Sequence, residues 1–372
     1  MKYLQIMFIL ILLLWTTGCD DFLLIEEVDT IIVFGLDTSD KEGAFTFFEA
    51  SPVFSETADK KYNIKKAVAH SAREARNILN AQATGHTVGG KIQLVILGKN
   101  LLKEKNIYPH LDVLFRDPKN EINARMLVVD GDVDQFLGAD MKDKGRIGIV
   151  IPDIMRTTHR VGGTVDTLLL DYHRQMMDKR VTPSMSEMTK MEDELIVTGT
   201  ALLNREGLYA QSINRRESSL LLMLQRQTNN PLSLDFRLPE DFVKAENERT
   251  EMSINIDNIN YETQVNCDQE NFELMIDMDI KGDITQKLFY FDMENRKQDF
   301  EKQLDKQLAE DFEKLIAKFQ QDELDPAGFG RYAKAYCYPQ WKKIKNDWPK
   351  DFAKSKVTIR PHIEIRDYGV QY

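Results

Sequence analysis

The sequence predicts a multidomain protein of the mixed α/β (α+β) class, in which mixed sheets pack with helices. Short β-branched, apolar runs alternate with helical patterns through the first half of the chain. The second half contains strands with period-2 alternation, followed by the longest helical pattern of the sequence. With 372 residues, 42% of them hydrophobic, the chain can bury the cores of two or three domains.

Strands and helices alternate in the first half. Residues 31–36 are apolar and rich in β-branched side chains, and the polar turn after them predicts a hairpin with residues 44–49. Val68, Ala72 and Ala75 share one face of a helical pattern. The elements expected here are strands at 31–36 and 44–49, a helix at 64–81, a strand at 92–97, a short helix at 101–117 broken by Pro109, a strand at 124–130 and a helix at about 163–178.

The second half predicts a sheet and a long amphipathic helix. Leu274, Ile276 and Met278 alternate with polar residues, which is typical of a strand with one buried face. Pro361 predicts an edge position or a bulge for the last strand, because proline cannot donate to the ladder. The expected elements are strands at 195–203, 252–256, 261–265 and 272–280, a helix at 217–227, the long helix at 295–322, a helical piece with Trp341 and Trp348, and a strand at 357–365.

The apolar stripe of the long helix runs from Phe300 to Phe319 at spacings of four and three. We expect this helix to lie across a sheet, although docking on a partner would use the same stripe. The loop signal at 182–194 is the best candidate boundary between the larger halves. We therefore divide the chain into a signal peptide at 1–18, an N-terminal α/β region at 19–190, with a further junction at 130–148, and a C-terminal α/β domain at 195–372.

The N-terminus has the pattern of a secretory signal. Lys2 precedes an apolar block at 4–15, and Gly18 stands before Cys19. The Gly-Cys step resembles a bacterial lipoprotein signal, cut before Cys19 with lipid added to that thiol, although Thr16 stands where such signals usually carry Leu. The block is short for a bilayer core of roughly 30 Å, which disfavours a permanent transmembrane anchor. A plain secretory signal that leaves Cys19 free is the other alternative.

The charge of the chain excludes some partners. The formal net charge is −11, and removing Lys2 with the signal makes it −12. Nucleic acid needs a basic face, and an anionic membrane surface would repel such a protein. Lipid at Cys19 would therefore have to hold it at the membrane, for which two or three acyl chains suffice.

The other two cysteines are Cys267 and Cys337. A disulfide between them is one alternative, but their distance in space cannot be read from sequence. We expect two reduced thiols, because an exported protein of this size does not need the covalent link on which small secreted domains depend.

Signals for enzymatic or metal chemistry are incomplete. Residues 85–92 approach a phosphate-binding P-loop, but Ile92 replaces the hydroxyl residue, and the stretch joins a helix to a strand in the wrong order. Asp130 starts a calcium-like loop in which Gln135 and Met141 replace the required Gly and Glu. Histidine spacing gives no zinc motif, and there is no G-x-S-x-G sequence. We therefore expect no cofactor, no metal ligands and no catalytic residues.

Seven short segments occur in a characteristic order along the chain. They are Cys19-Asp20-Asp21, Gly35-Leu36-Asp37, His70 to Arg76, Gly85-His86 with Gly98, Leu114 to Pro118, Gly199 to Leu202 and Asp325-Pro326-Ala327-Gly328-Phe329-Gly330. In this order they resemble the Ger(x)C lipoproteins, the C subunits of nutrient germinant receptors of endospore-forming bacteria. One difference is Asp20, where the family has Trp.

The resemblance implies a non-enzymatic subunit with a mixed α/β fold, anchored by lipid at Cys19 on the outer face of the spore inner membrane. It implies A-type and B-type integral-membrane receptor subunits as partners, and no nucleic acid. Asp325, Pro326, Gly328 and Gly330 would be family-motif residues with a structural role in the turn after the long helix. The alternative functions are an extracytoplasmic solute-binding lipoprotein, which would have a cleft between two lobes, and an extracytoplasmic hydrolase.

Overall fold

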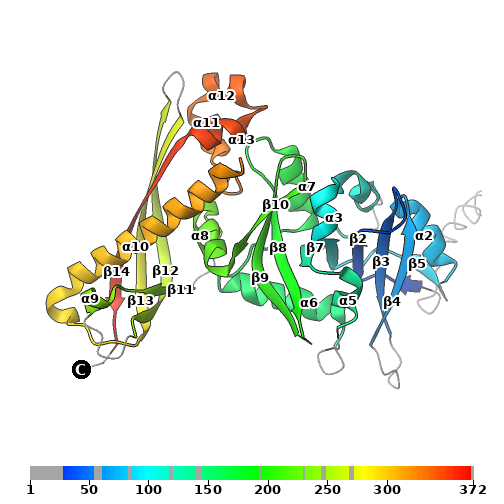
Figure 1. The fold of residues 1–372 in the computed structure, drawn as a ribbon, viewed down its shortest axis with the longest axis horizontal. Helices are drawn as coiled ribbons and strands as arrows, with labels where there is room; N and C mark the ends of the chain where they lie inside the picture. The colour runs from blue at the N-terminus through cyan, green and yellow to red at the C-terminus, as the bar shows by residue number, and fades with distance from the viewer. Residues whose placement is uncertain are drawn as a thin grey trace, which may run out of the picture.

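The computed structural model describes residues 28–53, 61–82, 85–116, 120–139, 145–192, 194–228, 231–243, 249–267 and 272–369. The signal segment and Cys19 therefore lie outside the described residues. The molecule is elongated, with an eight-stranded sheet in one part and a four-stranded sheet in the other (Figure 1). This arrangement confirms the predicted mixed α/β, multidomain fold with a long C-terminal helix.

The larger sheet has a parallel centre and antiparallel borders. Strands β2, β6, β7 and β8 run parallel, while β3 and β4 on one side and β9 and β10 on the other pair antiparallel. In spatial order the strands are β10 (Tyr209–Asn214), β9 (Glu194–Leu203), β8 (Ser184–Met191), β7 (Arg125–Asp130), β6 (Leu94–Gly98), β2 (Val33–Asp37), β3 (Phe45–Pro52) and β4 (Tyr62–Ala69). The predicted boundary at 190–195 falls in the hairpin between β8 and β9.

Helices cover both faces of this sheet. Alternate residues of a strand point to opposite faces, so Phe34 enters one core and Val33 the other. The helices on the first face are α2 (Ala72–Asn80), α3 (Lys99–Glu104), the 3₁₀ turn η2 (Tyr108–Leu111), α4 (Asp112–Arg116) and α7 (Leu169–Met177). On the second face lie α5 (Val133–Leu137) and α6 (Ile147–Arg160). Strands β1 (Val28–Thr30) and β5 (His86–Val88) pair in parallel and form a separate two-stranded sheet.

The second part is a four-stranded sheet crossed by the long helix. Its order is β11 (Leu232–Arg237), β12 (Glu251–Cys267), β13 (Phe272–Lys287) and β14 (Lys356–Asp367). Helix α10 (Met293–Gln321) lays Phe300, Leu308 and Phe319 on one face of the sheet. The remaining helices are α8 (Arg215–Gln225), α9 (Glu240–Val243), α11 (Gly330–Tyr336), α12 (Tyr338–Ile344) and α13 (Trp348–Lys354).

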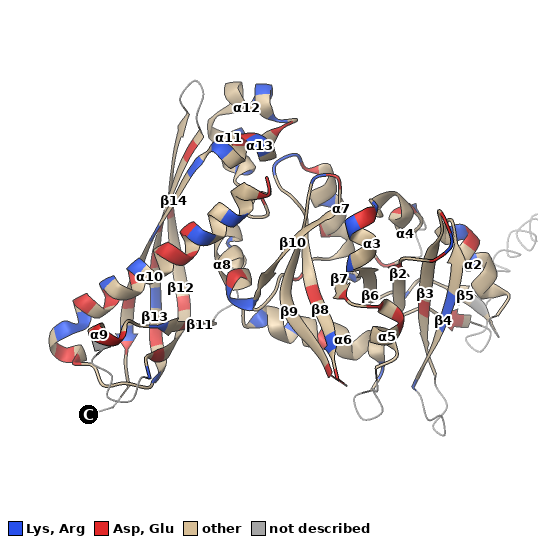
Figure 2. Cartoon of the chain, in the orientation of Figure 1, with Lys and Arg blue, Asp and Glu red and all other residues tan. Residues whose placement is uncertain are grey.

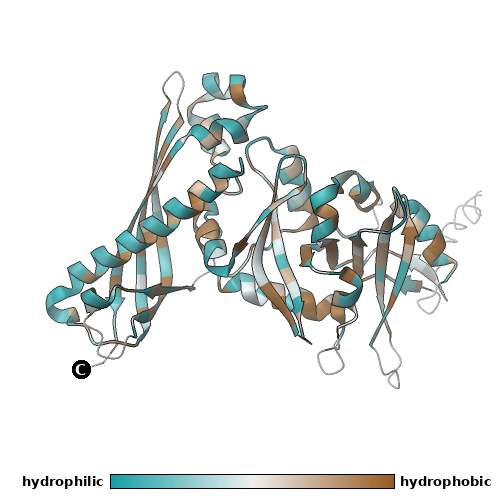
Figure 3. Cartoon of the chain, viewed as in Figure 1, coloured by the Kyte–Doolittle hydropathy of each residue, from teal (hydrophilic) through white to brown (hydrophobic). Residues whose placement is uncertain are grey.

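The two faces of this sheet differ in character. Figure 3 shows apolar residues alternating with polar ones along α10, whose apolar stripe enters the core. On the opposite face, Arg360 pairs with Asp277, and Lys281 pairs with Glu364 on the neighbouring strand. Figure 2 shows both signs of charge interspersed over these strands. The alternation of the strands therefore separates a packed face from a solvated face.

Strand β14 lies at the edge of the sheet, as Pro361 predicts, and α10 covers that edge. The Ile365 N–H donates to the Glu301 carboxylate at 2.9 Å, and the Ile363 N–H donates to Asp305 at 2.6 Å. Pro361 is the next residue in this alternating series and has no N–H to satisfy. Unpaired edge groups invite pairing with another chain, so the two carboxylates and the proline protect this edge.

Several segments differ from the sequence-based prediction, among them the loop signal at 182–194, which contains strand β8 of the large sheet. Residues 64–69 are not helical: they belong to the edge strand β4, which pairs with β3 and leaves Val68 exposed, so the helix begins only at Ala72. Helix α6 was missed, because residues 130–148 were interpreted as a polar junction and the next helix was expected at 163–178. The separate strands expected at 252–256 and 261–265 are one strand, β12, with a register shift between Ile256 and Asn258.

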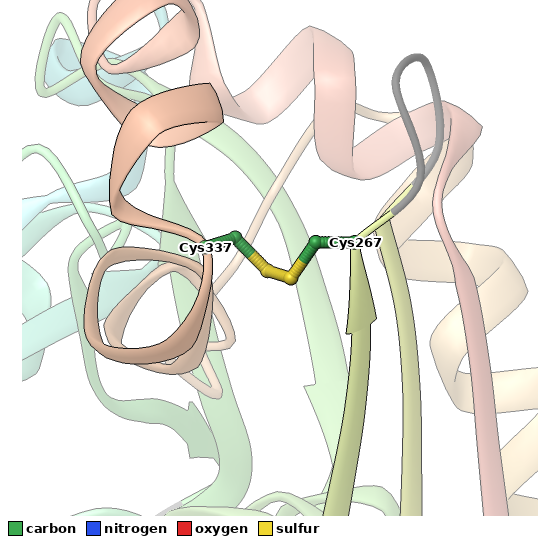
Figure 4. Close-up of a disulfide and its surroundings, with 2 residues drawn as sticks. All are labelled: Cys267 and Cys337. Atoms are coloured by element: carbon green, nitrogen blue, oxygen red, sulfur yellow. A yellow bond between two sulfur atoms is a disulfide. The ribbon is translucent and has the colours of Figure 1, made fainter.

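The prediction of two reduced thiols was wrong. Cys267, at the end of β12, and Cys337, between α11 and α12, form a disulfide with a Cα–Cα distance of 5.8 Å (Figure 4). The two residues are 70 positions apart in the sequence. The hairpin of β12 and β13 is thus fastened covalently to the terminal helices, a contact that only the folded chain reveals.

We predict that the double substitution of Cys267 and Cys337 by Ser lowers the free energy of unfolding by about 2–4 kcal/mol, because the bond restricts the unfolded chain. Urea unfolding of the wild type with and without dithiothreitol measures the effect. The double variant should be insensitive to the reductant. A wild type with the same urea midpoint in both conditions would contradict the prediction.

The buried carboxylate of Glu49 in β3 predicts that the free energy of unfolding depends on pH. Burial, opposed by the charges of Arg76 and Lys65, raises the pKa of Glu49 from 4.5 to about 7. The folded state therefore favours the protonated form of Glu49. The contribution of this side chain to stability is fully present below pH 4.5 and is lost as the pH rises through 7. We predict that Glu49→Gln gains up to about 3 kcal/mol relative to wild type between pH 4.5 and pH 8, measured by urea unfolding. A pH-independent difference would refute this.

Candidate functional site

The turn between α10 and α11 is built around the carboxylate of Asp325. One oxygen accepts hydrogen bonds from the backbone N–H groups of Gly328 at 2.7 Å and Phe329 at 2.9 Å. The other accepts from the Gly330 N–H at 2.8 Å and from the Trp348 indole at 2.7 Å. One side chain therefore fixes the start of α11 and holds α13 against it.

Each motif residue around Asp325 has its own structural role in the turn. Gly328 has a φ of +79°, a conformation that glycine adopts without strain. A Cβ on Gly330 would lie 2.7 Å from the Trp348 indole nitrogen and 2.8 Å from the Arg180 carbonyl oxygen, so this position needs a close backbone approach. The Pro326 carbonyl accepts a hydrogen bond from the Gln225 side chain of α8 at 2.8 Å. The structure thus brings all four motif residues to one place.

This turn is joined to the region before β8. The Thr182 N–H donates to the Asp325 carbonyl at 2.9 Å, and the Asp325 N–H donates to the Thr182 hydroxyl at 2.9 Å. Thr182 and Asp325 are both fully buried. We call Asp325, Thr182, Trp348 and the glycines at 328 and 330 the Asp325 junction, because they connect the two parts of the molecule.

The surroundings of the Asp325 carboxylate suit a structural role better than a role in proton transfer. Burial raises the pKa of Asp325, while the hydrogen bonds from Trp348 and the three backbone N–H groups act to lower it. All four partners are donors, so the carboxylate is matched as an acceptor and has no exposed face for a substrate. A carboxylate in this setting is suited to holding segments together.

A polar cavity of about 550 Å³ lies beside the junction. Its wall includes Pro326 and Arg331 from the junction side, Arg174 from α7, Ser184 at the start of β8, and Gln225 from α8. Figure 1 shows α7, α8 and α11 around this region, where the two parts of the chain meet. The cavity is therefore bordered by segments from both parts.

A second polar cluster lies at the carboxyl ends of the parallel strands, where open α/β sheets commonly bind ligands. The Lys99 ammonium pairs with Asp130 at 2.9 Å and with the buried Glu187 at 3.0 Å. Burial acts to lower the pKa of Lys99, but hydrogen bonds to these two carboxylates outweigh it and raise the pKa. Asp37 accepts from the Val133 N–H at 3.0 Å and occupies the space beside Gly98. Each carboxylate of this cluster therefore has a partner, either the Lys99 ammonium or a backbone N–H group.

The segments considered for nucleotide and calcium have structural explanations. Residues 86–88 form β5 rather than a phosphate loop, and the Asp132 side chain accepts from the Gln135 N–H as the cap of α5. Within the part of the chain that the structure describes, no three His, Cys, Asp or Glu side chains are placed to hold a metal ion.

Sequence reasoning missed the partners of Asp325. Thr182 is 143 positions away along the chain, and it appeared only as part of a loop signal. Trp348 is 23 positions away and was assigned only to a helical piece. A buried Trp needs an acceptor for its indole N–H, which was a usable signal, but it does not say which acceptor.

We predict that Asp325→Asn lowers the free energy of unfolding by about 2–4 kcal/mol, because an amide presents N–H groups to donors that are buried. Trp348→Phe should cost about 1–2 kcal/mol, since it removes one of the four donors and keeps a ring. Urea unfolding measures both.

Asp322→Asn, in the exposed cap of α10, is the matched control and should leave the urea midpoint unchanged. An Asp325→Asn variant as stable as that control would show that the junction does not depend on the carboxylate.

Comparison with known proteins gives consistent matches over most of the chain. The family model "Spore germination protein N-terminal domain" matches residues 21–190, and "Spore germination B3/GerAC like, C-terminal" matches residues 198–369. The putative spore germination protein YfkR of Bacillus subtilis (strain 168) is 20% identical over 321 residues, covering 84% of this chain and 80% of that protein. The crystal structure of the GerBC protein superposes with a TM-score of 0.58 at 11% identity, covering 90% of this chain and 97% of GerBC.

The likeness to GerBC shows the shared fold, and the two family models meet at the hairpin between β8 and β9. Together with the resemblance of the sequence segments, these matches establish that the chain belongs to the Ger(x)C family of spore germination proteins.

Proposed function

We propose that this protein is the lipid-anchored, non-enzymatic C subunit of a nutrient germinant receptor, held at the outer face of the spore inner membrane. The observation that carries the proposal is the match of both family models, which cover the N-terminal and C-terminal parts in the family order. The buried polar clusters around Asp325 and Lys99 have internal partners, which supports a binding and assembly role over catalysis.

The anchor in this proposal is lipid on Cys19. In the part of the chain that the structure describes, no helix is both long and apolar enough to cross a bilayer. The formal charge of −11 gives no electrostatic attraction to an anionic membrane. Lipid on Cys19 supplies the affinity that the composition does not.

The position of Cys19 also bears on orientation. Cys19 and Val28, the first residue of β1, are nine positions apart, so the segment that joins them reaches at most about 30 Å when extended. Strands β1 and β5 lie at one end of the elongated molecule and the C-terminus at the other (Figure 1). The end that carries β1 would therefore stay near the membrane, with the four-stranded sheet directed away from it.

We predict that Cys19→Ala leaves the protein unprocessed or released and abolishes the nutrient response, because the lipid has no attachment point. The measurements are the fraction of C-terminally tagged protein in spore membranes and the germination rate. Asp40→Ala, in the exposed turn before β3, is the matched control. Normal membrane retention and germination of Cys19→Ala would contradict the anchor.

The receptor assignment is tested by co-purification of the tagged wild type from spore membranes. We expect A-type and B-type integral-membrane subunits to be recovered with the wild type. They should not be recovered with Cys19→Ala, because that variant is not held at the membrane. Recovery of the wild type without multi-pass proteins would count against the receptor.

A further inference from the structure

Two residues that line the cavity beside the Asp325 junction carry buried polar atoms that lack hydrogen-bond partners among the described residues. They are the Ser184 hydroxyl and the side-chain oxygen of Gln225. Ser184 is 1% exposed, and its backbone is already bonded, since its N–H donates to Gln175 and its carbonyl accepts from Thr167. Buried polar groups in proteins are nearly always satisfied, so these two atoms indicate a missing partner.

Two of the three carboxylates that line the cavity, those of Asp166 and Asp178, are neutralised by close arginine pairs, and the third, Asp171, meets Arg174 at 3.4 Å. Asp166 makes a bidentate pair with Arg125 at 2.8 and 3.0 Å, and Asp178 makes one with Arg180 at 2.7 Å for both bonds. These carboxylates therefore add little negative charge to the cavity that a ligand would meet.

Two arginines of the cavity wall are not neutralised in the same way. Arg174 makes one long contact of 3.4 Å with Asp171. Arg331 lines the cavity and forms no ion pair within the described residues. Burial acts to raise the pKa of Asp178, but the hydrogen bonds from Arg180 and the charges of Arg180 and Arg331 lower it. The Arg331 guanidinium lies against Gly328, where any side chain would meet it at 3.2 Å. The cavity thus has a positive wall that the motif glycine helps to shape.

We propose that this cavity binds a small organic carboxylate that also carries an N–H or O–H donor. The carboxylate would be held by Arg174 and Arg331, whose guanidinium groups match carboxylate geometry. The donor would reach the Gln225 oxygen, and the Ser184 hydroxyl, which can donate or accept, would bond the same molecule. This proposal does not depend on the anchor or on the receptor partners, because it concerns the isolated chain.

The test is isothermal titration calorimetry of the purified full-length chain in detergent micelles at low salt. L-Serine and L-lactate carry both required groups, acetate has the carboxylate alone, and L-serinamide replaces the carboxylate of serine by an amide. We expect saturable binding of L-serine or L-lactate, weaker binding of acetate and none of L-serinamide.

The variants locate the site. Arg174→Gln and Arg331→Gln should each weaken binding about tenfold, and Ser184→Ala should weaken it about fivefold. Arg237→Gln, an exposed arginine of β11 in the other sheet, is the matched control and should bind as wild type. The arginine variants are on the surface, and their urea midpoints verify that the fold is kept even if Ser184→Ala proves unstable.

Two results would overturn the proposal. One is the absence of saturable heat with both L-serine and L-lactate up to about 10 mM, which would leave ordered water as the partner of Ser184 and Gln225. The other is binding whose affinity is unchanged in both Arg174→Gln and Arg331→Gln, which would place the ligand elsewhere.

Discussion

The hydrogen bonds accepted by Asp325 are the interaction on which the arrangement of this molecule depends. Three backbone N–H groups at the start of α11 and the Trp348 indole all point to one carboxylate, in a place that water does not reach. Each of these donors would be left unsatisfied if the carboxylate were removed, and unsatisfied buried groups are costly. Because the Asp325 backbone also bonds Thr182 twice, the same residue fixes the terminal helices to the sheet of the first part.

The four-stranded part depends on a second constraint, the protection of its parallel edge strand. Helix α10 could lie over the sheet at many angles, but Glu301 and Asp305 are one turn apart and meet the N–H groups of Ile365 and Ile363. The apolar stripe of the helix and its carboxylates therefore select one position together. The disulfide of Cys267 fastens the far end of the hairpin to the same terminal helices, so the sheet is held at both its edge and its tip.

The elements with strong periodicity could be predicted from the sequence, and the contacts between distant segments could not. Helix α10 occupies 293–321 where 295–322 was expected, and β13 follows the alternation that predicts it. Residues 64–69 were assigned to a helix because a few alanines and a valine also fit a helical spacing, and the pairing with β3 decided otherwise. Of the candidate site, the turn with Gly328 could be foreseen, but the partners Thr182 and Trp348 and the bond of Cys267 to Cys337 arise from packing between segments that the sequence does not place together.

The charge distribution bears on how an anchored protein of this shape would be presented to membrane partners. Many charges of the four-stranded sheet are paired across strands, but the chain as a whole remains strongly acidic. In the proposed anchored state, an anionic membrane surface would repel such a body, which would favour an upright position over one lying along the bilayer. In that position, the parts within reach of a membrane-embedded subunit are β1, β5 and their neighbours. The cavity and the Asp325 junction would then lie between the two parts, where a bound ligand would meet α7 and the start of β8 on one side and α8 and the turn before α11 on the other.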